Sequence, residues 1–115
     1  MTWTVQLHPD FADEVEAHPH DVQEAVVAAV RLLQQMGPQL KRPHCDTLKG
    51  SQFSNMKELR FDAADGVWRV AFAFDPNRQA VLLVGGDKSG TSSKKFYKAL
   101  IRSADQRFND WLVDQ

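Results

Sequence analysis

The feature that most constrains the fold is the stretch NMKELRFDAADGVWRVAFAF, residues 55–74, in which two alternating runs flank a short polar loop. Alternation of bulky apolar side chains with smaller or polar ones is typical of a strand that buries one face. In the second run the bulky face consists of Trp68, Val70, Phe72 and Phe74. The stretch therefore predicts a β-hairpin closed by the loop Ala63–Gly66.

The register of this hairpin decides which side chains share a face. Leu59 and Phe61 join the bulky core face if Phe61 lies opposite Trp68, and that register places Arg60 directly opposite Arg69. Like charges directly opposed are destabilising, and a cross-strand pair is worth roughly 0.2–1 kcal/mol. Because the guanidinium fork matches phosphate oxygens, we expect this pair to form an uncovered phosphate-binding face.

Two alternatives remain open for this face. Glu58, which the register places opposite Ala71, could bridge both arginines, or the arginines could simply extend into water. The C-terminal helix could instead pack over the alanines and bury the arginines, which would require them to be fully paired. Carrying the same parity into the next strand places Arg69 opposite Val84, with Lys88 on the same face if that strand continues.

The rest of the chain predicts the other elements. We expect a strand at Trp3–His8, a short helix from Asp10 to His18, a helix begun by an Asp21–Glu24 capping box and ended at Gly37, a long loop over 37–55, strands at Met56–Asp62, Val67–Phe74 and Gln79–Val84, and a final helix capped by Ser92 or Ser93. The order β-α-α-β-β-β-α predicts an α+β fold. In it a small antiparallel sheet carries a helical hairpin and a C-terminal helix on one face, and residues 1–115 form a single domain.

The net charge of −1 conceals a segregation of charge along the chain. Residues 1–36 carry six acidic and one basic residue, whereas residues 37–60 carry five basic and two acidic ones. The basic part could attract a phosphate-bearing partner, although ordinary surface charge would look the same. The lone Cys45, short apolar runs and the absence of a leader predict a cytoplasmic protein with no membrane segment.

The motifs LKG, MKELR, WRVAFAF and LLVGGDK, followed by KKFYKALIRSADQRF, occur in this order within residues 40–110. In these motifs the sequence resembles phage-derived HigB-like toxins of the RelE/ParE superfamily. The resemblance implies the toxin of a type II toxin–antitoxin system: a small endoribonuclease that cuts mRNA on the ribosome and halts translation. It also implies a cognate antitoxin, often a helix-turn-helix protein, and no metal or other cofactor.

Metal-free RNA cleavage uses the 2′-hydroxyl of the RNA as the nucleophile, so a base, an acid and charge-stabilising cations are required. We expect Arg60 and Arg69 to stabilise the charge on the phosphate. Glu58 could be the base or could orient an arginine. Lys88 could assist the leaving group if neighbouring cations depress its pKa.

Four further residues are predicted to contact RNA. Lys49 in LKG is expected at the backbone, and His44, which titrates near neutrality, could be brought in by the long loop. Lys57 points away from Arg60 unless a bulge intervenes. The family often has a C-terminal tyrosine for base stacking, and Tyr97 is the candidate, with a core role as the alternative. The histidines and Cys45 lack the spacing of a known zinc module, so no metal site is predicted.

Two other classes of protein remain possible at this stage. A ParE-like toxin would share the fold but act on DNA gyrase through protein contacts, without chemistry at a cationic face. An inert relative would only bind its antitoxin. The opposed pair Arg60 and Arg69 argues for the nuclease, because neither rival needs it.

Overall fold

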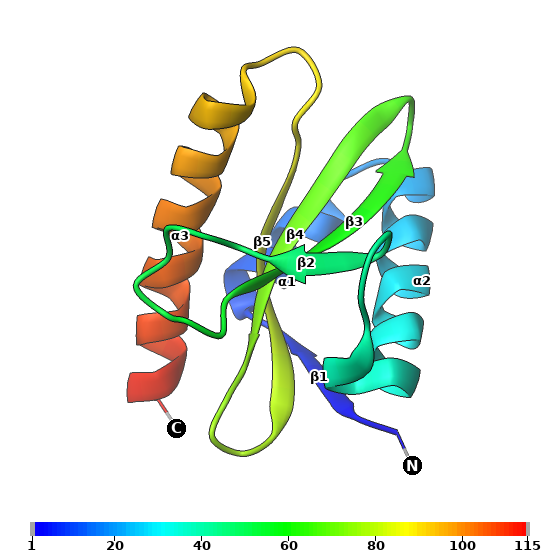
Figure 1. Cartoon of the computed structure of the whole chain (residues 1–115). Coiled ribbons are helices and arrows are strands. Elements are labelled where there is room, and N and C mark those ends of the chain that lie inside the picture. Colours follow the sequence, from blue (N-terminus) through cyan, green and yellow to red (C-terminus); the bar gives the residue numbers. More distant parts are fainter. Residues whose placement is uncertain (1, 115) are drawn as a thin grey trace.

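A computed structural model describes residues 2–114 as an α+β fold with a five-stranded sheet (Figure 1). The elements are β1 (Thr4–Leu7), α1 (Pro9–Glu16), α2 (His20–Met36), the 3-10 turn η1 (Gly37–Gln39), β2 (Cys45–Thr47), β3 (Lys57–Ala63), β4 (Gly66–Phe74), β5 (Gln79–Asp87) and α3 (Ser93–Val113). The strand order is β1-β5-β4-β3-β2, with β1 parallel to β5 and the other neighbours antiparallel. The predicted fold class is confirmed.

The hairpin of β3 and β4 has the predicted register. Its opposed pairs include Phe61 with Trp68, Leu59 with Val70, Arg60 with Arg69, and Glu58 with Ala71. The turn fixes this register, since Ala64 and Asp65 both have positive φ, 49° and 61°. Two successive residues with positive φ form the tight turn whose twist matches that of the strands.

The pairing of β4 with β5 differs from the prediction. Arg69 lies opposite Gly86 and not Val84. One residue of this difference arises at the turn, which pairs Phe74 with Ala80, and the second arises after Ala71, where the register shifts and β5 carries one extra residue. Such a bulge changes the parity of every following residue. The strand also continues to Asp87 instead of ending at Val84.

Helices cover both faces of the sheet, so the expectation that all helices pack on one face was wrong (Figure 1). The face that carries Val70 and Phe72 packs against α1 and α2, whereas Ala71 and Ala73 pack against the apolar stripe of α3. The alternative in which the C-terminal helix packs over the alanines is therefore the correct one. Small side chains let a helix approach a sheet closely, and the stripe of α3 needs a partner surface.

Two local predictions were wrong and one was right. The long loop contains the short strand β2, whose three residues are too few to produce a readable pattern. Helix α2 begins after Pro19 without a side-chain cap, since Asp21 accepts only from the amide of Val22. Ser92 caps α3 as expected, by accepting from the amide of Lys95.

Within residues 2–114, no helix has the length and apolar content needed to cross a membrane.

Candidate active site

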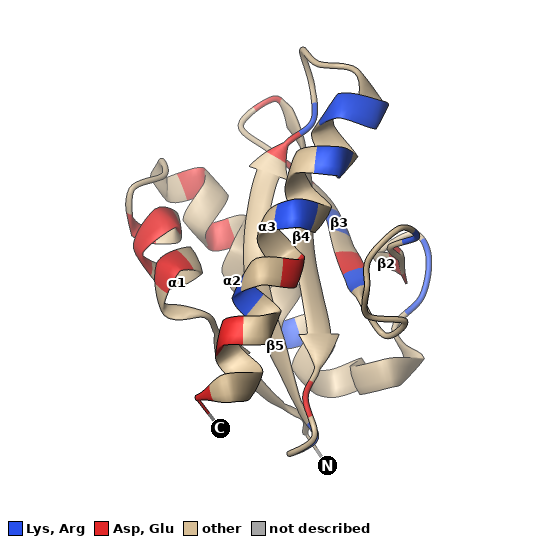
Figure 2. Ribbon diagram, turned by 90° about the vertical axis from the view of Figure 1, so that its left-hand side faces the viewer, with Lys and Arg blue, Asp and Glu red and all other residues tan. Residues whose placement is uncertain are grey.

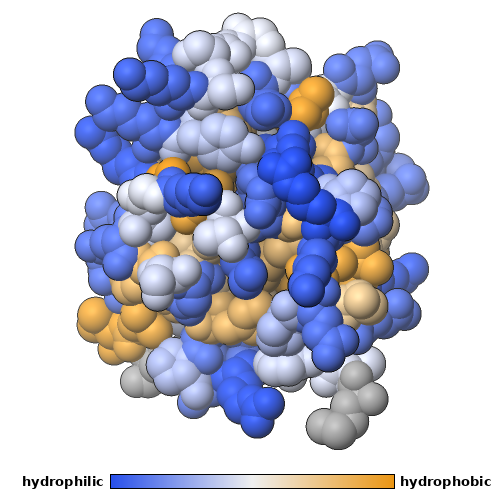
Figure 3. Space-filling model, viewed as in Figure 1, coloured by the Kyte–Doolittle hydropathy of each residue, from blue (hydrophilic) through white to orange (hydrophobic). Residues whose placement is uncertain are grey.

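The charges on the folded molecule are separated in space as well as in sequence. Acidic residues gather on α1, and basic residues gather on the N-terminal half of α3 and around β2 and β3 (Figure 2). Strongly hydrophilic side chains also lie across the middle of the face shown in Figure 3, with hydrophobic atoms visible between them. The basic side is therefore where an anionic ligand would bind.

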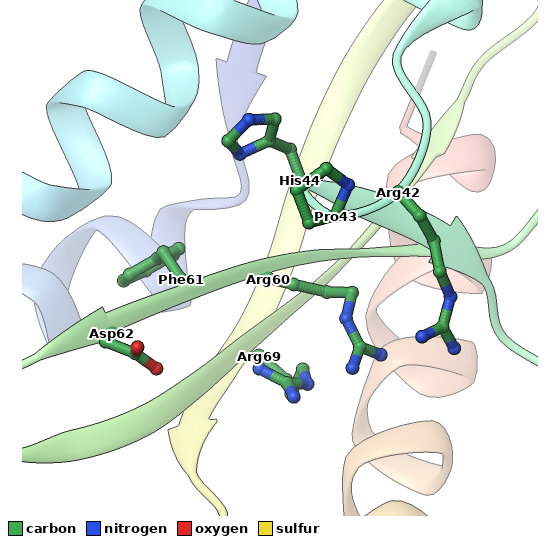
Figure 4. Close-up of a pocket in the computed structure, with 7 residues that line it drawn as sticks. All are labelled: Arg42, Pro43, His44, Arg60, Phe61, Asp62 and Arg69. Atoms are coloured by element: carbon green, nitrogen blue, oxygen red, sulfur yellow. The ribbon is translucent and has the colours of Figure 1, made fainter.

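Three guanidinium groups converge on one pocket on this side (Figure 4). Arg60 extends from β3 and Arg69 from β4, and Arg42 reaches the same space from the segment before β2. The pocket has a volume of about 700 Å³ and is completed by Pro43, His44, Phe61 and Asp62. Converging arginines around an open cavity are suited to hold the oxygens of a phosphate.

The carboxylate of Glu58 makes the opposed arginines compatible. Its Oε2 accepts a hydrogen bond from Arg60 Nη1 at 3.0 Å, and its Oε1 lies 3.6 Å from Arg69 Nε. Glu58 is only 4% exposed, so this charge acts in a poorly solvated environment. Bridging by Glu58, which the sequence left open as an alternative, is what the structure contains.

Arg69 is far more buried than an uncovered face would allow. Its exposed fraction is 6%, its Nη1 donates to the carbonyl of Trp68 at 2.8 Å, and its Nε donates to the hydroxyl of Tyr97 at 3.3 Å. The expectation of an uncovered pair was wrong because α3 packs over this half of the sheet. Arg69 nevertheless lines the pocket, and its Nη2 has no protein partner within residues 2–114.

Tyr97 joins α3 to the hairpin. Its hydroxyl donates to Glu58 Oε1 at 2.7 Å, and Lys88 Nζ lies 5.9 Å from the centre of its ring. Burial of the hydroxyl, followed by its hydrogen bond to Glu58, raises the pKa of Tyr97. Tyr97 therefore lies beside Arg69, and its phenol keeps its proton at neutral pH. Lys88 lies near the ring of Tyr97 but does not line the arginine pocket.

Three of the residues predicted to contact RNA lie at different places relative to the arginine pocket. His44 lines the pocket, although its side chain lies on the other side of β3 from the guanidiniums (Figure 4). Lys49 is exposed in the loop after β2 and does not line this pocket. Lys57 lies on the α2 face of the sheet, as its parity with Leu59 requires, so the fold does not bring it to the arginines.

Arg42 is the pocket residue that the sequence did not reveal. Its Nη2 and Nε both donate to Asp46 Oδ2, at 2.7 and 3.0 Å, and this pair holds the pKa of Asp46 below its ordinary value. The residue lies in a loop without periodicity, so no pattern could assign its direction. The excess of positive charge over residues 37–60 was the available signal. Among residues 2–114, no group of three His, Cys, Asp or Glu side chains could share a metal ion.

Two solved structures have the same fold. An arginine-to-alanine double mutant of the E. coli toxin RelE in the free state superposes with a TM-score of 0.64 at 11% identity, covering 93% of this chain and 98% of that one. A chain of the archaeal RelE–RelB complex from Pyrococcus horikoshii superposes with a TM-score of 0.56 at 16% identity, covering 79% of this chain and 100% of that one. The fold is therefore of the RelE type.

The chain belongs to the family of phage-derived Gp49-like proteins (DUF891), whose model matches residues 13–109. The Mycobacterium tuberculosis protein named "Putative toxin HigB3" is 47% identical over 95 residues, 83% of this chain and 81% of that protein. "Putative toxin HigB2" of the same organism is 42% identical over 91 residues, 78% of this chain but only 45% of that protein. The resemblance to HigB-like toxins of the RelE/ParE superfamily is confirmed, and the chain is a RelE/HigB-type toxin of a toxin–antitoxin system.

Proposed function

We propose that this toxin is a metal-independent endoribonuclease that cleaves mRNA on the ribosome and thereby stops translation. The observation that carries the proposal is the direct opposition of Arg60 and Arg69 at one pocket. A protein that acts only through contacts with another protein does not require two guanidiniums opposed at an open pocket. A nuclease needs them, because negative charge grows on the phosphate in the transition state.

The reaction would begin when the 2′-hydroxyl oxygen of the RNA attacks the adjacent phosphorus. The new bond closes a 2′,3′-cyclic phosphate as the bond from phosphorus to the 5′-oxygen breaks. A base takes the proton of the 2′-hydroxyl, and an acid gives a proton to the departing 5′-oxygen. Arg60 and Arg69 would stabilise the dianionic phosphorane between these steps, each through N–H groups that have no partner among residues 2–114.

Glu58 is better suited to position the arginines than to act as the base. Both of its carboxylate oxygens already accept hydrogen bonds, from Arg60 and Tyr97. To take a proton from RNA it would first have to release one of these donors. Lys88 is our candidate for the acid that gives a proton to the departing 5′-oxygen, since its ammonium group lies near the ring of Tyr97. His44 is the candidate base, because it lines the same pocket and an imidazole can accept a proton, although its side chain would first have to turn across β3 to reach the phosphate.

The partners follow from the same proposal. The cognate antitoxin would be a helix-turn-helix protein, and the substrate would be mRNA in the cytoplasm. The structural likeness to a chain of a RelE–RelB complex supports an antitoxin partner for this fold. Binding of the antitoxin would neutralise the toxin.

The test is cleavage of a defined mRNA by purified protein, with and without ribosomes and in the presence of EDTA. Primer extension should show new 5′ ends only with active toxin, and the upstream fragment should end in a 2′,3′-cyclic phosphate. Arg31→Ala, on the exposed outer side of α2, is the matched control for Arg69→Ala. Gyrase-linked DNA breaks without any RNA cleavage would overturn the proposal in favour of a ParE-like action.

A further inference from the structure

A row of cations on α3 lies outside the pocket described above. Residues 88–104 contain five basic residues and no acidic one. Lys94, Lys98 and Arg102 follow one another at intervals of four residues, so they share a face of α3. We call these three residues the α3 basic row.

The row lines a groove between α3 and the loop after β2. The groove has a volume of about 530 Å³ and is lined by the three cations together with Gly50, Tyr97 and Ile101. A Cβ atom at Gly50 would lie 3.7 Å from Ile101 Cδ1, so the loop closely approaches α3 there. The groove therefore combines a cationic wall with an aromatic and apolar floor.

The cations of the row have no hydrogen-bond or ion-pair partner among the described residues. Within residues 2–114, their side chains make no hydrogen bond or ion pair, and all three are exposed. The next basic residue on the helix behaves differently, since Arg107 is paired with Glu14 at 2.6 Å. In the part of the chain that the structure describes, no ion pair thus neutralises the charge of the row.

The start of the row is also unfavourable for the helix itself, since Lys94 is its only member in the first turn of α3. Lys94 and Lys95 lie in the first turn of α3, which contains no acidic residue. Cations are destabilising at a helix N-terminus, where the macrodipole is positive, and like charges four residues apart add to this effect. A sequence selected only for stability would have acidic side chains in this turn, so stability alone does not account for Lys94.

Tyr97 links the groove to the arginines of the proposed active site. The hydroxyl of Tyr97 contacts Glu58 and Arg69, and the residue also lines the groove. From Lys94 to Arg102 the helix rises about 12 Å, because each residue adds about 1.5 Å. A strand whose phosphate lies on Arg60 and Arg69 could therefore continue along the row with its following phosphates.

We propose that the α3 basic row binds the phosphate backbone of the single-stranded RNA that flanks the cleaved phosphate, with its bases against the floor of the groove. The inference deepens the proposed nuclease function and rests on it. Single-stranded nucleic acid is favoured over an acidic protein because evenly spaced cations beside an aromatic ring match a regular polyanion with stackable bases. Sequence preference is not expected from these contacts, since phosphates carry no sequence information.

The experiment measures binding of a fluorescent single-stranded DNA of about 12 nucleotides, which lacks the 2′-hydroxyl and is not cleaved. The triple variant Lys94→Gln, Lys98→Gln and Arg102→Gln is compared with the wild type by fluorescence anisotropy over a salt series. The measured quantity is the salt slope, the steepness with which the logarithm of the binding constant falls with the logarithm of the salt concentration. Each lost phosphate contact should lower this slope by about 0.7, so the triple variant should lose about 2 units of slope. Between 50 and 200 mM salt, the wild type should then lose roughly 20-fold more affinity than the variant.

Two controls separate the row from charge in general. Lys95→Gln removes one charge from the same helical turn but outside the groove, so it should retain the wild-type slope, unlike Lys94→Gln. A trinucleotide, too short to reach beyond the pocket, should bind the triple variant and the wild type equally. Equal slopes for the triple variant and the wild type on the longer strand would overturn the inference, as would undetectable binding by the wild type.

Poly-L-glutamate serves as an acidic chain without bases. Binding of poly-L-glutamate as tight as that of the oligonucleotide, and lost equally in the triple variant, would overturn the nucleic-acid assignment in favour of an acidic protein partner. The proposed function is tested separately by mRNA cleavage on ribosomes. If the wild type cleaves mRNA but the triple variant keeps the wild-type salt slope, only the inference about the α3 basic row is refuted. If the wild type does not cleave mRNA, the proposed nuclease function and the inference that rests on it are both refuted.

Discussion

The hydroxyl of Tyr97 donates a hydrogen bond of 2.7 Å to the carboxylate of Glu58, which joins the C-terminal helix to the hairpin across 39 residues of sequence. The same carboxylate accepts from Arg60 and lies 3.6 Å from Arg69. One residue of α3 thus takes part in holding both arginines. The orientation of the proposed phosphate site depends on the docking of α3 as well as on the register of the hairpin.

Replacing Tyr97 by phenylalanine should lower the free energy of unfolding by about 1–2 kcal/mol, because a hydrogen bond to a charged acceptor is lost while the ring remains. Urea unfolding at pH 7 would measure the change. Phe96→Leu is a suitable control, since Phe96 contacts the ring of Tyr97 without entering the network around Glu58. An unchanged unfolding midpoint for Tyr97→Phe would show that the ring alone attaches α3 to the sheet.

Replacing Arg69 by alanine should lower the rate of mRNA cleavage by at least about 100-fold and abolish growth inhibition, because a donor to the developing phosphate charge is removed. Arg69→Lys should keep the charge but not the fork, so it should recover only part of the activity. Growth inhibition on induced expression and primer extension on ribosomes measure the two effects. Full toxicity of a folded Arg69→Ala protein would mean that the phosphate lies elsewhere.

The success of the sequence in predicting the hairpin and its failure over α3 have one physical explanation. The opposition of Arg60 and Arg69 was predictable because a tight turn and one apolar face fix the register locally. The covering of Ala71 was not, since the apolar stripe of a helix shows that it packs on something but not on which face. The partner of Arg69 in β5 was missed because the turn between β4 and β5 pairs Phe74 with Ala80, one residue further along β5 than the turn signal indicated, and because a bulge leaves no regular signature in the alternation.

Replacing Trp68 by alanine should destabilise the protein by about 3 kcal/mol, since a large buried side chain leaves a cavity. Trp68 is 7% exposed, and the centre of its ring lies 4.9 Å from that of His18 and 6.4 Å from that of Phe61. Differential scanning calorimetry should show a clear fall in Tm. Val27→Ala, at a residue that is 48% exposed, should change Tm little. A Trp68→Ala protein that melts like the wild type would be incompatible with this core face.

The pair formed by Glu14 and Arg107 should contribute stability that depends on pH. The hydrogen bond from Arg107 is the main reason why the pKa of Glu14 lies below its ordinary value. A depressed acid stabilises the fold above its unfolded pKa, about 4.3, and this contribution is lost as the pH falls through the lower folded value. Because the carboxylate is 45% exposed, we expect less than about 1 kcal/mol.

The measurement is the urea midpoint of Glu14→Gln and of the wild type from pH 7 to pH 3. The difference between the two proteins should be constant above about pH 5 and should shrink below it. Glu16→Gln, on the exposed part of α1, is the control. A difference that persists unchanged at pH 3 would attribute the effect to packing and not to charge.

Lys94→Gln and Lys95→Gln should both raise the free energy of unfolding, each by about 0.3–1 kcal/mol at low ionic strength, because each removes a cation from the positive end of α3. The two variants should differ only in binding, since Lys94 lines the groove and Lys95 does not. Thermal melts at low and high salt would measure the stability of each variant, and the oligonucleotide titrations would measure its affinity for single strands. A protein that becomes more stable and binds single strands less well after Lys94→Gln would show that the row is kept for a ligand at the expense of the helix. A loss of stability in either variant would contradict the electrostatic argument for α3.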